Sequence, residues 1–334
     1  MKLFILVCLL LAPALFSQSL PDKYLDSLVK AGIVHLTNQD YFRAELVFEK
    51  IRSTYPDNPL GNLYLAAGTI LESSDYGLPL EEKKIEDLLD AAMKKANALL
   101  SNDSESLWNN YYVALVKGFE AYYNGLNGSM LSALSSGLKA VSYFEKCIAI
   151  DPDFSDAYIA LGTYKYWKSD KTDFLNWLPF VTDERQTGID YLRKGIYGNS
   201  KNALLGFNSL VWIHIRQKNF REALKIANDA IIRFPSSRMI KMSLARVHEN
   251  SDFAKAISLY REVLASFEKE NKLTNYRRVI LLHKIAQNYQ RLGDNKKALA
   301  LCNEILAIKN FSAYESQKLQ GRLKRVNELR DELK

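Results

Sequence analysis

The sequence predicts an all-α protein built as a solenoid of stacked helical hairpins with a C-terminal capping helix. The main observation is a recurring spacing, in which a small residue is followed by bulkier apolar residues at i+4 and i+7. The instances are Ala44, Phe48 and Ile51; Ala140, Phe144 and Cys147; Ala223, Ala227 and Ala230; Ala256, Tyr260 and Val263; and Ala298, Cys302 and Ile305. Such residues share one helix face, and the small residue lets a neighbouring helix approach closely. In three instances a proline, at 56, 152 and 235, then ends the helix. A fixed period of this kind is typical of stacked helical units.

Composition supports a folded, globular chain. Among 334 residues, 48% are hydrophobic and 25% are charged, which is a balance typical of folded domains. The net charge of +7 is modest for this length, and no basic block is present. In the densest charged run, from Arg322 to Lys334, basic and acidic residues alternate, which is typical of a solvent-exposed helix face. We therefore expect no nucleic-acid partner.

The first residues predict export. A positive start, Met1-Lys2, precedes an apolar run from Leu3 to Leu11, and Ala12 to Ser17 follows. This pattern predicts a signal peptide over residues 1–17, cleaved before Gln18. The apolar run is too short for a comfortable membrane span, although a retained anchor is the alternative. The mature chain is expected to be periplasmic or secreted, without a stable membrane span.

The expected elements follow in chain order, with repeats over 18–310 and a capping helix over 311–334. The first hairpin covers 25–56 with a polar turn at 37–40, and helices at 60–71 and 81–100 follow, joined by a loop at 73–79. A third pair covers 104–123 and 130–150, broken at 124–128, and a fourth begins near 158, resumes near 184 and carries an insertion at 168–183. Three regular hairpins and a final helix at 312–333 complete about seven hairpins. The polar outer face of that last helix is what caps an open stack.

Tyr158, Leu161 and Gly162, placed before second helices of the Ala-x3-Phe type, resemble the tetratricopeptide repeat. The resemblance covers roughly residues 25–309. It implies a right-handed superhelix whose first helices line a concave groove for peptides or partner proteins. The function expected from it is a non-enzymatic, exported scaffold or adaptor that binds a protein or peptide in this groove. The insertion at 168–183 departs from the family pattern.

Catalytic and metal-binding patterns are missing from the sequence. No His-x3-His, His-Glu-x2-His or Cys-x2-Cys spacing occurs, and no glycine-rich loop joins a strand to a helix. His35 and His214 occupy the same apolar slot of two repeats, where we expect them to pack helices together. Cys147 and Cys302 fall in apolar slots of distant repeats, which favours two buried thiols over a disulfide. We therefore predict no enzyme activity, no cofactor and no metal.

Candidate partner-binding residues are aromatic and polar side chains outside the repeat slots, because aromatic and arginine side chains dominate binding hot spots. They are Tyr166, Trp167, Trp177, Phe180, Trp212, Arg216, Gln287 and Arg291. The alternative is that they only pack repeats together. The apolar insertion around Trp177 and Phe180 must either fold back, shaping or blocking the groove, or meet a partner. A rival function is glycan binding on a repeat platform, since exposed Trp and Tyr suit sugar faces.

Overall fold

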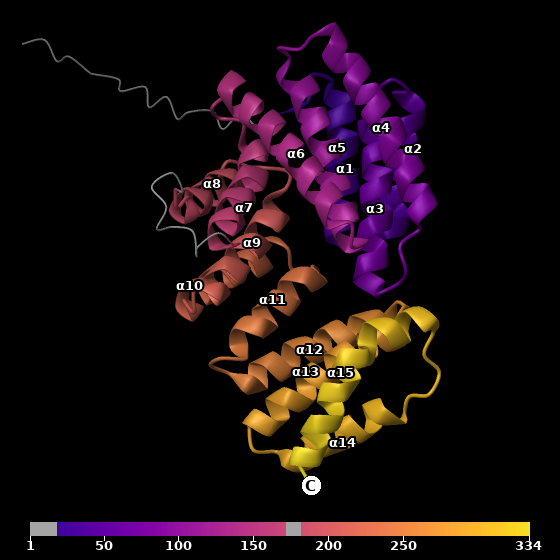
Figure 1. Cartoon of the computed structure of the whole chain (residues 1–334), viewed down its shortest axis with the longest axis vertical. Coiled ribbons are helices and arrows are strands. Elements are labelled where there is room, and N and C mark those ends of the chain that lie inside the picture. Colours follow the sequence, from indigo (N-terminus) through magenta and orange to yellow (C-terminus); the bar gives the residue numbers. More distant parts are fainter. Residues whose placement is uncertain (1–18, 172–181) are drawn as a thin grey trace, which may run out of the picture.

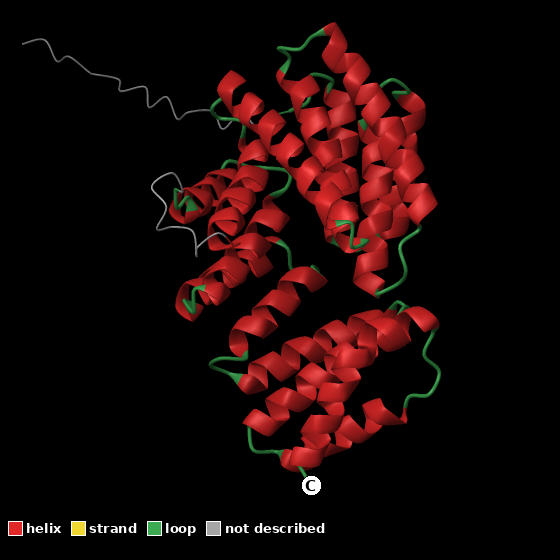
Figure 2. Cartoon of the chain, viewed as in Figure 1, coloured by secondary structure: helices red, strands yellow, loops and turns green. Residues whose placement is uncertain are grey.

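The structure is a computed structural model that describes residues 19–171 and 182–334. Within these two ranges the chain forms helices joined by turns and contains no strand, which confirms the predicted fold class (Figure 2). The helices are α1 (Lys23–Thr37), α2 (Tyr41–Thr54), α3 (Leu60–Tyr76), α4 (Glu82–Asn102), α5 (Leu107–Leu126), α6 (Met130–Ile150), α7 (Ser155–Lys171), α8 (Arg185–Tyr197), α9 (Ala203–Arg216), α10 (Phe220–Arg233), α11 (Arg238–His248), α12 (Phe253–Lys269), α13 (Asn275–Arg291), α14 (Asn295–Ala307) and α15 (Ala313–Glu332).

Consecutive helices pack as hairpins, and each hairpin packs on the next. α1 pairs with α2, α3 with α4, and the pattern continues to α13 with α14, after which α15 packs on α13 and α14 (Figure 1). The helices α1–α6 form one upright bundle, α7–α10 lie beside it, and α11–α15 lie below. The chain thus curls back, so that its last helices lie beneath its first.

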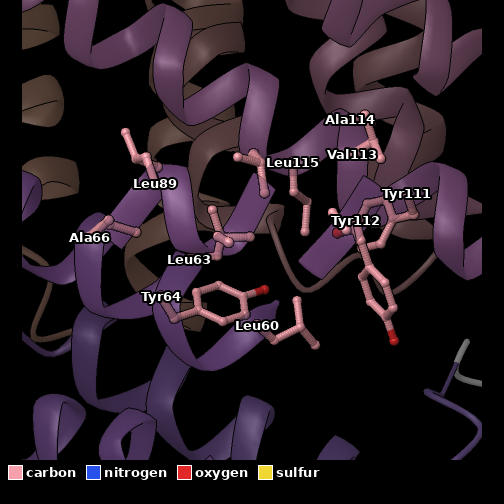
Figure 3. Packing of buried hydrophobic residues seen from close by; sticks show 14 of the residues in the cluster. Leu60, Leu63, Tyr64, Ala66, Leu89, Tyr111, Tyr112, Val113, Ala114 and Leu115 are labelled. Carbon is pink, nitrogen blue, oxygen red and sulfur yellow. The ribbon is translucent and has the colours of Figure 1, made fainter. Parts of the chain in front are cut away.

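The recurring spacing explains the packing of the second helices. Every apolar residue of that spacing is buried: Ala44, Phe48, Ile51, Ala140, Phe144, Cys147, Ala223, Ala227, Ala230, Ala256, Tyr260, Val263, Ala298, Cys302 and Ile305. Cys147 and Cys302 are free thiols, as expected, and burial raises the pKa of Cys147 to about 12. Figure 3 shows the same close packing in the first bundle, where Leu63 and Tyr64 of α3 lie near Leu89 of α4 and Leu115 of α5.

The turns inside the hairpins share one local device. Asp40, Asn219, Asp252 and Asp294 each accept a backbone N–H bond at the start of a second helix. Such caps satisfy donors that the first helical turn leaves unpaired. At three of these turns a residue with positive φ precedes the cap: Gln39, Lys218 and Gly293, and at Gly293, with φ of 79°, glycine carries no steric penalty.

Several helix ends differ from expectation. α3 continues through Ser73 and Asp75 to Tyr76, where a loop was expected, because Ser73 and Tyr76 are buried against neighbouring helices. α5 likewise continues to Leu126, beyond the break expected at 124. The final helix agrees with its prediction, and Ser312 begins it through a capping box with Glu315.

Candidate functional site

The concave side of the solenoid is bridged, whereas the sequence predicted an open groove. The end of α3 meets α11 and α13 through a closing contact, formed by Asp75, Tyr76, Arg238, Glu270 and Arg277. The guanidinium of Arg238 is 3.0 Å from Asp75 Oδ2 through Nε and 2.6 Å from Glu270 Oε1 through Nη1. Arg277 donates to the carbonyl of Asp75 at 2.5 Å. These residues are far apart in the sequence, so periodicity alone could not place them together.

The closing contact is buried and closely packed. The side chain of Arg238 is only 4% exposed and stacks on the Phe267 ring, 4.4 Å from its centroid. Burial would lower the pKa of Arg238, but the bonds to Asp75 and Glu270 outweigh this effect and raise it. At Gly77, which has a φ of 70°, an added Cβ would lie 2.0 Å from the Tyr276 ring. The two halves of the chain therefore meet at close range.

A second buried contact joins the start of the chain to its middle. Lys201, before α9, lies 3.6 Å from both Asp26 of α1 and Asp156 of α7. All three side chains are less than 10% exposed. Asp156 also accepts the Ser200 hydroxyl at 2.7 Å. Together the two contacts hold the inner faces of the first and later helices around a shared space.

That space is the central cavity, of about 360 Å³, lined by residues of α1, α2, α3, α5, α9, α11, α12 and α13. Its wall is mostly apolar. Leu36, Leu71, Phe119, Trp212 and Met242 are examples of its lining. Three side chains in the wall, Leu205, Trp212 and Tyr122, remain 40–44% exposed. The cavity thus presents apolar surface to water, although it lies within the folded chain.

A basic cluster, defined as Arg246, Lys284, Arg291 and Arg322 around Glu249, lies on α11 and α13, which line the cavity, and on α15. Arg246 stands one helical turn beyond Met242, and Lys284 one turn beyond Leu281, which both line the cavity. Lys284 Nζ is 3.1 Å from Glu249 Oε1, and Arg291 Nη1 is 2.9 Å from the Glu249 carbonyl oxygen. Arg246 also pairs with Glu249, which accepts the Tyr260 hydroxyl at 2.6 Å. Three cationic side chains therefore share one carboxylate, and Arg322 is close enough for the charge of Glu249 to affect its pKa.

Burial makes this charge excess costly. Burial would raise the pKa of Glu249, but Lys284, the Tyr260 hydroxyl and Arg246 together lower it below its ordinary value. Burial lowers the pKa of Lys284, and Glu249 partly offsets that effect. Burial also lowers the pKa of Arg322, and neighbouring Arg325 lowers it further. Partly desolvated cations without matching anions favour the approach of an acidic group.

The residues proposed from sequence do not form one site. Tyr166 is buried and packs edge-on against Trp167, with ring centroids 5.3 Å apart. Trp167 itself packs against the core of α7–α13. Both rings thus contribute to helix packing, and Tyr166 also lines a surface pocket together with Arg216. Arg216 pairs with Asp170 at 3.3 Å on the surface at the end of α9.

The remaining candidates lie elsewhere. Trp212 lines the central cavity, and Arg291 belongs to the basic cluster, with Gln287 one turn before it on α13. Trp177 and Phe180 lie outside the described residues. The sequence reasoning missed Arg246, Lys284 and Arg322. Arg246 and Lys284 could have been found by comparing the cationic residues at equivalent positions in the first helix of each hairpin.

Other kinds of site find no support in the described ranges. Among residues 19–171 and 182–334, no group of three His, Cys, Asp or Glu side chains could hold a metal ion. No helix there is long and apolar enough to cross a membrane. Trp108 and Trp167 pack against core clusters, and Trp212, which is 40% exposed, faces the central cavity.

Comparison with known proteins agrees with the repeat architecture. Residues 209–271, which span α9 to α12, match the family model of the tetratricopeptide repeat. No curated protein sequence is similar enough to this chain to count as a relative.

Among solved structures, the APC/C hetero-tetramer Cut9–Hcn1 has a similar fold, with a TM-score of 0.52 and 16% identity. The match covers 92% of this chain and 50% of that one. A thermophilic tetratricopeptide repeat protein of Thermus thermophilus matches with 13% identity and a TM-score of 0.42, over 67% of this chain and 98% of its own. YrrB, described as having an unusual peptide-binding site, matches with 12% identity and a TM-score of 0.44. The match covers 67% of this chain and 97% of YrrB. Residues 209–271 are thus similar to tetratricopeptide repeats, and the buried repeat spacing and the paired helices extend the same architecture along the described chain.

Proposed function

We propose that this protein is a non-enzymatic interaction scaffold whose basic cluster binds an acidic segment of a protein or peptide partner. The observation that carries this proposal is the charge excess of the cluster, where Arg246, Lys284 and Arg291 share the single carboxylate of Glu249 and Arg322 adds a fourth cation nearby. A carboxylate-rich segment would neutralise cations that are already partly desolvated. Such complementarity contributes both orientation and association rate.

The test uses a fluorescein-labelled hexaglutamate peptide and the mature chain from residue 18, followed by fluorescence anisotropy. The informative variant is Arg322→Gln, because Arg322 is the member of the cluster for which no ion pair with Glu249 is found. We expect it to weaken binding about tenfold, equivalent to about 1.4 kcal/mol. Raising the NaCl concentration should weaken binding by the wild-type chain, because salt screens exposed charge pairs.

The matched control is Lys324→Gln, which removes the same charge from the same helix at a side chain that is 79% exposed. It should change the affinity less than twofold. An equal loss of peptide affinity in the two variants would mean that binding depends only on the net charge of the protein. The assignment to the basic cluster would then be abandoned. A hexalysine peptide should not bind either variant or the wild type.

We further propose that the chain is exported and acts in the periplasm or outside the cell. The support is the positive start and the apolar run of Leu3 to Leu11. Expression of the full chain in a bacterial host should yield a product that begins at Gln18, as measured by intact mass. Leu10→Arg, which interrupts the apolar run, should leave the precursor uncleaved in the cytoplasm. A full-length product in the membrane fraction would favour a retained anchor instead.

A further inference from the structure

We propose that the central cavity is a second binding site, which takes one small, uncharged and predominantly apolar molecule. This site differs from the basic cluster in place and chemistry, and it does not depend on the proposed function. It exists because the closing contact joins α3 to α11 and α13, which surrounds the space with inner helix faces.

The size of the cavity selects a small molecule over a peptide helix. Its volume is about 360 Å³, within the usual range of ligand pockets of about 300–1,000 Å³. An α-helix with side chains has a diameter of about 10 Å and a pitch of 5.4 Å, so one turn fills roughly 400 Å³. A helical segment of a partner would therefore fit only if the closing contact broke and the surrounding helices moved apart. A molecule of one to three fused or linked rings would fit.

The charges in the wall select an uncharged molecule, because each has an internal partner. Lys201 pairs with Asp26 and Asp156, and Arg238 with Asp75 and Glu270. A charged ligand would lose its hydration and find these partners already engaged, which is unfavourable in a partly enclosed site.

The polar groups of the wall are also largely engaged. Arg277 donates to the backbone carbonyls of Ser74 and Asp75. Asn208 Oδ1 accepts the Ser243 hydroxyl at 2.7 Å, and Asn202 Nδ2 donates to Tyr111 at 3.3 Å. A ligand with few polar atoms therefore suits the cavity better than a sugar or a nucleotide.

The exposed apolar surface of the cavity supplies the driving force. Trp212 and Leu205 of α9 and Tyr122 of α5 all line the cavity and are 40–44% exposed. Covering such surface removes it from water, which favours binding. Met239 and Met242 of α11 complete the wall, and their flexible side chains can adapt to the outline of a ligand.

The experiment compares two fluorescent probes that share one ring system. N-phenyl-1-naphthylamine is uncharged, and 8-anilinonaphthalene-1-sulfonate carries an added sulfonate. Titration of the mature chain should show one equivalent of the uncharged probe bound, with at least tenfold weaker binding of the sulfonate. The uncharged probe should also raise the melting temperature, because it binds only the folded chain. Equal affinities for the two probes would overturn the proposal.

Substitutions that fill the cavity test whether the probe binds inside it. Leu205→Trp adds bulk to a side chain that lines the cavity yet is 42% exposed, so the fold should persist. We expect it to weaken the uncharged probe at least tenfold. Met239→Trp, on α11, is the second filling variant and should act in the same direction. Circular dichroism would confirm that both variants fold.

The matched control is Leu131→Trp, at an exposed apolar position on α6 that does not line the cavity and is 86% exposed. It should leave probe affinity within twofold of the wild type. If this control weakens the probe while both filling variants bind normally, the probe sits on α6 and the central site is refuted. Unchanged binding in all three variants would refute it equally.

Discussion

At the scale of single residues, the crossing of α7 and α8 depends on two glycines. A Cβ added at Gly162 would lie 2.6 Å from the Gly188 carbonyl oxygen, and one added at Gly188 would lie 2.7 Å from the Gly162 carbonyl oxygen. Both obstructing atoms belong to the backbone and cannot rotate away. Gly162, which the sequence marked only as part of the tetratricopeptide-like pattern, is therefore a point where two helix backbones approach closely.

Gly162→Ala should destabilise the protein by about 1–3 kcal/mol, because the helices must separate to admit the methyl group. Gly118→Ala is the matched control, since that position lies inside α5 with no neighbouring atom within 4 Å of the added carbon. There the same change should stabilise by about 0.5–1 kcal/mol through helix propensity. Urea unfolding measures the change in the free energy of unfolding for each variant. If both changes had the same sign, the close approach of α7 and α8 at Gly162 would be contradicted.

His283 gives a prediction of pH dependence. Burial, followed by the charges of Arg322, Lys284 and Arg325, lowers its pKa to about 4. The folded chain therefore binds a proton there less readily than the unfolded chain, whose pKa is near 6.5. The contribution that neutral His283 makes to the free energy of unfolding is fully present above pH 6.5, and it is lost as the pH falls toward 4.

His283→Leu should remove this contribution. Between pH 6 and pH 4.5 the wild type should lose up to about 1.4 kcal/mol per pH unit more than the variant, which is the slope for one proton. Urea unfolding across this range gives the two slopes, and titrations elsewhere in the chain cancel in their difference. Parallel slopes would show that His283 is protonated with equal ease in both states.

At the scale of elements, α6 buries large apolar side chains only in its C-terminal half. Ala140, Phe144 and Cys147 in its C-terminal half are buried, whereas Leu131 and Leu134 in its N-terminal half are 86% and 58% exposed. With 21 residues, α6 is longer than the second helices α10 and α14, which have 14 and 13 residues. The structure shows that its extra length carries apolar surface outward.

Two substitutions on α6 should therefore differ widely in cost. Phe144→Ala should destabilise by about 3–5 kcal/mol, because it leaves a cavity in the core. Leu134→Gln should stay within about 0.5 kcal/mol of the wild type, as expected for an exposed position. Chemical denaturation compares them. A loss well above 1 kcal/mol at Leu134 would mean that another chain covers this face in solution.

At the scale of the whole molecule, the closing contact converts an open stack into a ring. In an open solenoid each repeat contacts only its neighbours, so stability is close to a sum of local terms. Here Arg238 ties α11 to Asp75 of α3, which lies in a distant hairpin. We expect this link to make the first and last helices unfold together.

Arg238→Met should cost about 3–5 kcal/mol, because Asp75 and Glu270 lose their shared cation. Small-angle X-ray scattering should show a larger radius of gyration, and backbone amides of residues 74–77 should exchange faster with deuterium. Arg261→Met, at an exposed arginine of α12, is the control and should change neither. An unchanged radius together with unchanged exchange would contradict a ring held by this contact.

The sequence by itself determined the helices, their pairing, the buried slots and the final capping helix. It could do so because helix periodicity, capping residues and breakers act over a few neighbouring residues, as at Ala44, Phe48 and Asp40. The bridging of the groove, the central cavity and the basic cluster were decided only by the tertiary structure. They join side chains such as Asp75 and Arg238, whose meeting depends on small rotations summed over many hairpins. No local pattern encodes that sum, and burial against distant helices also carried α3 through the polar segment that resembled a loop.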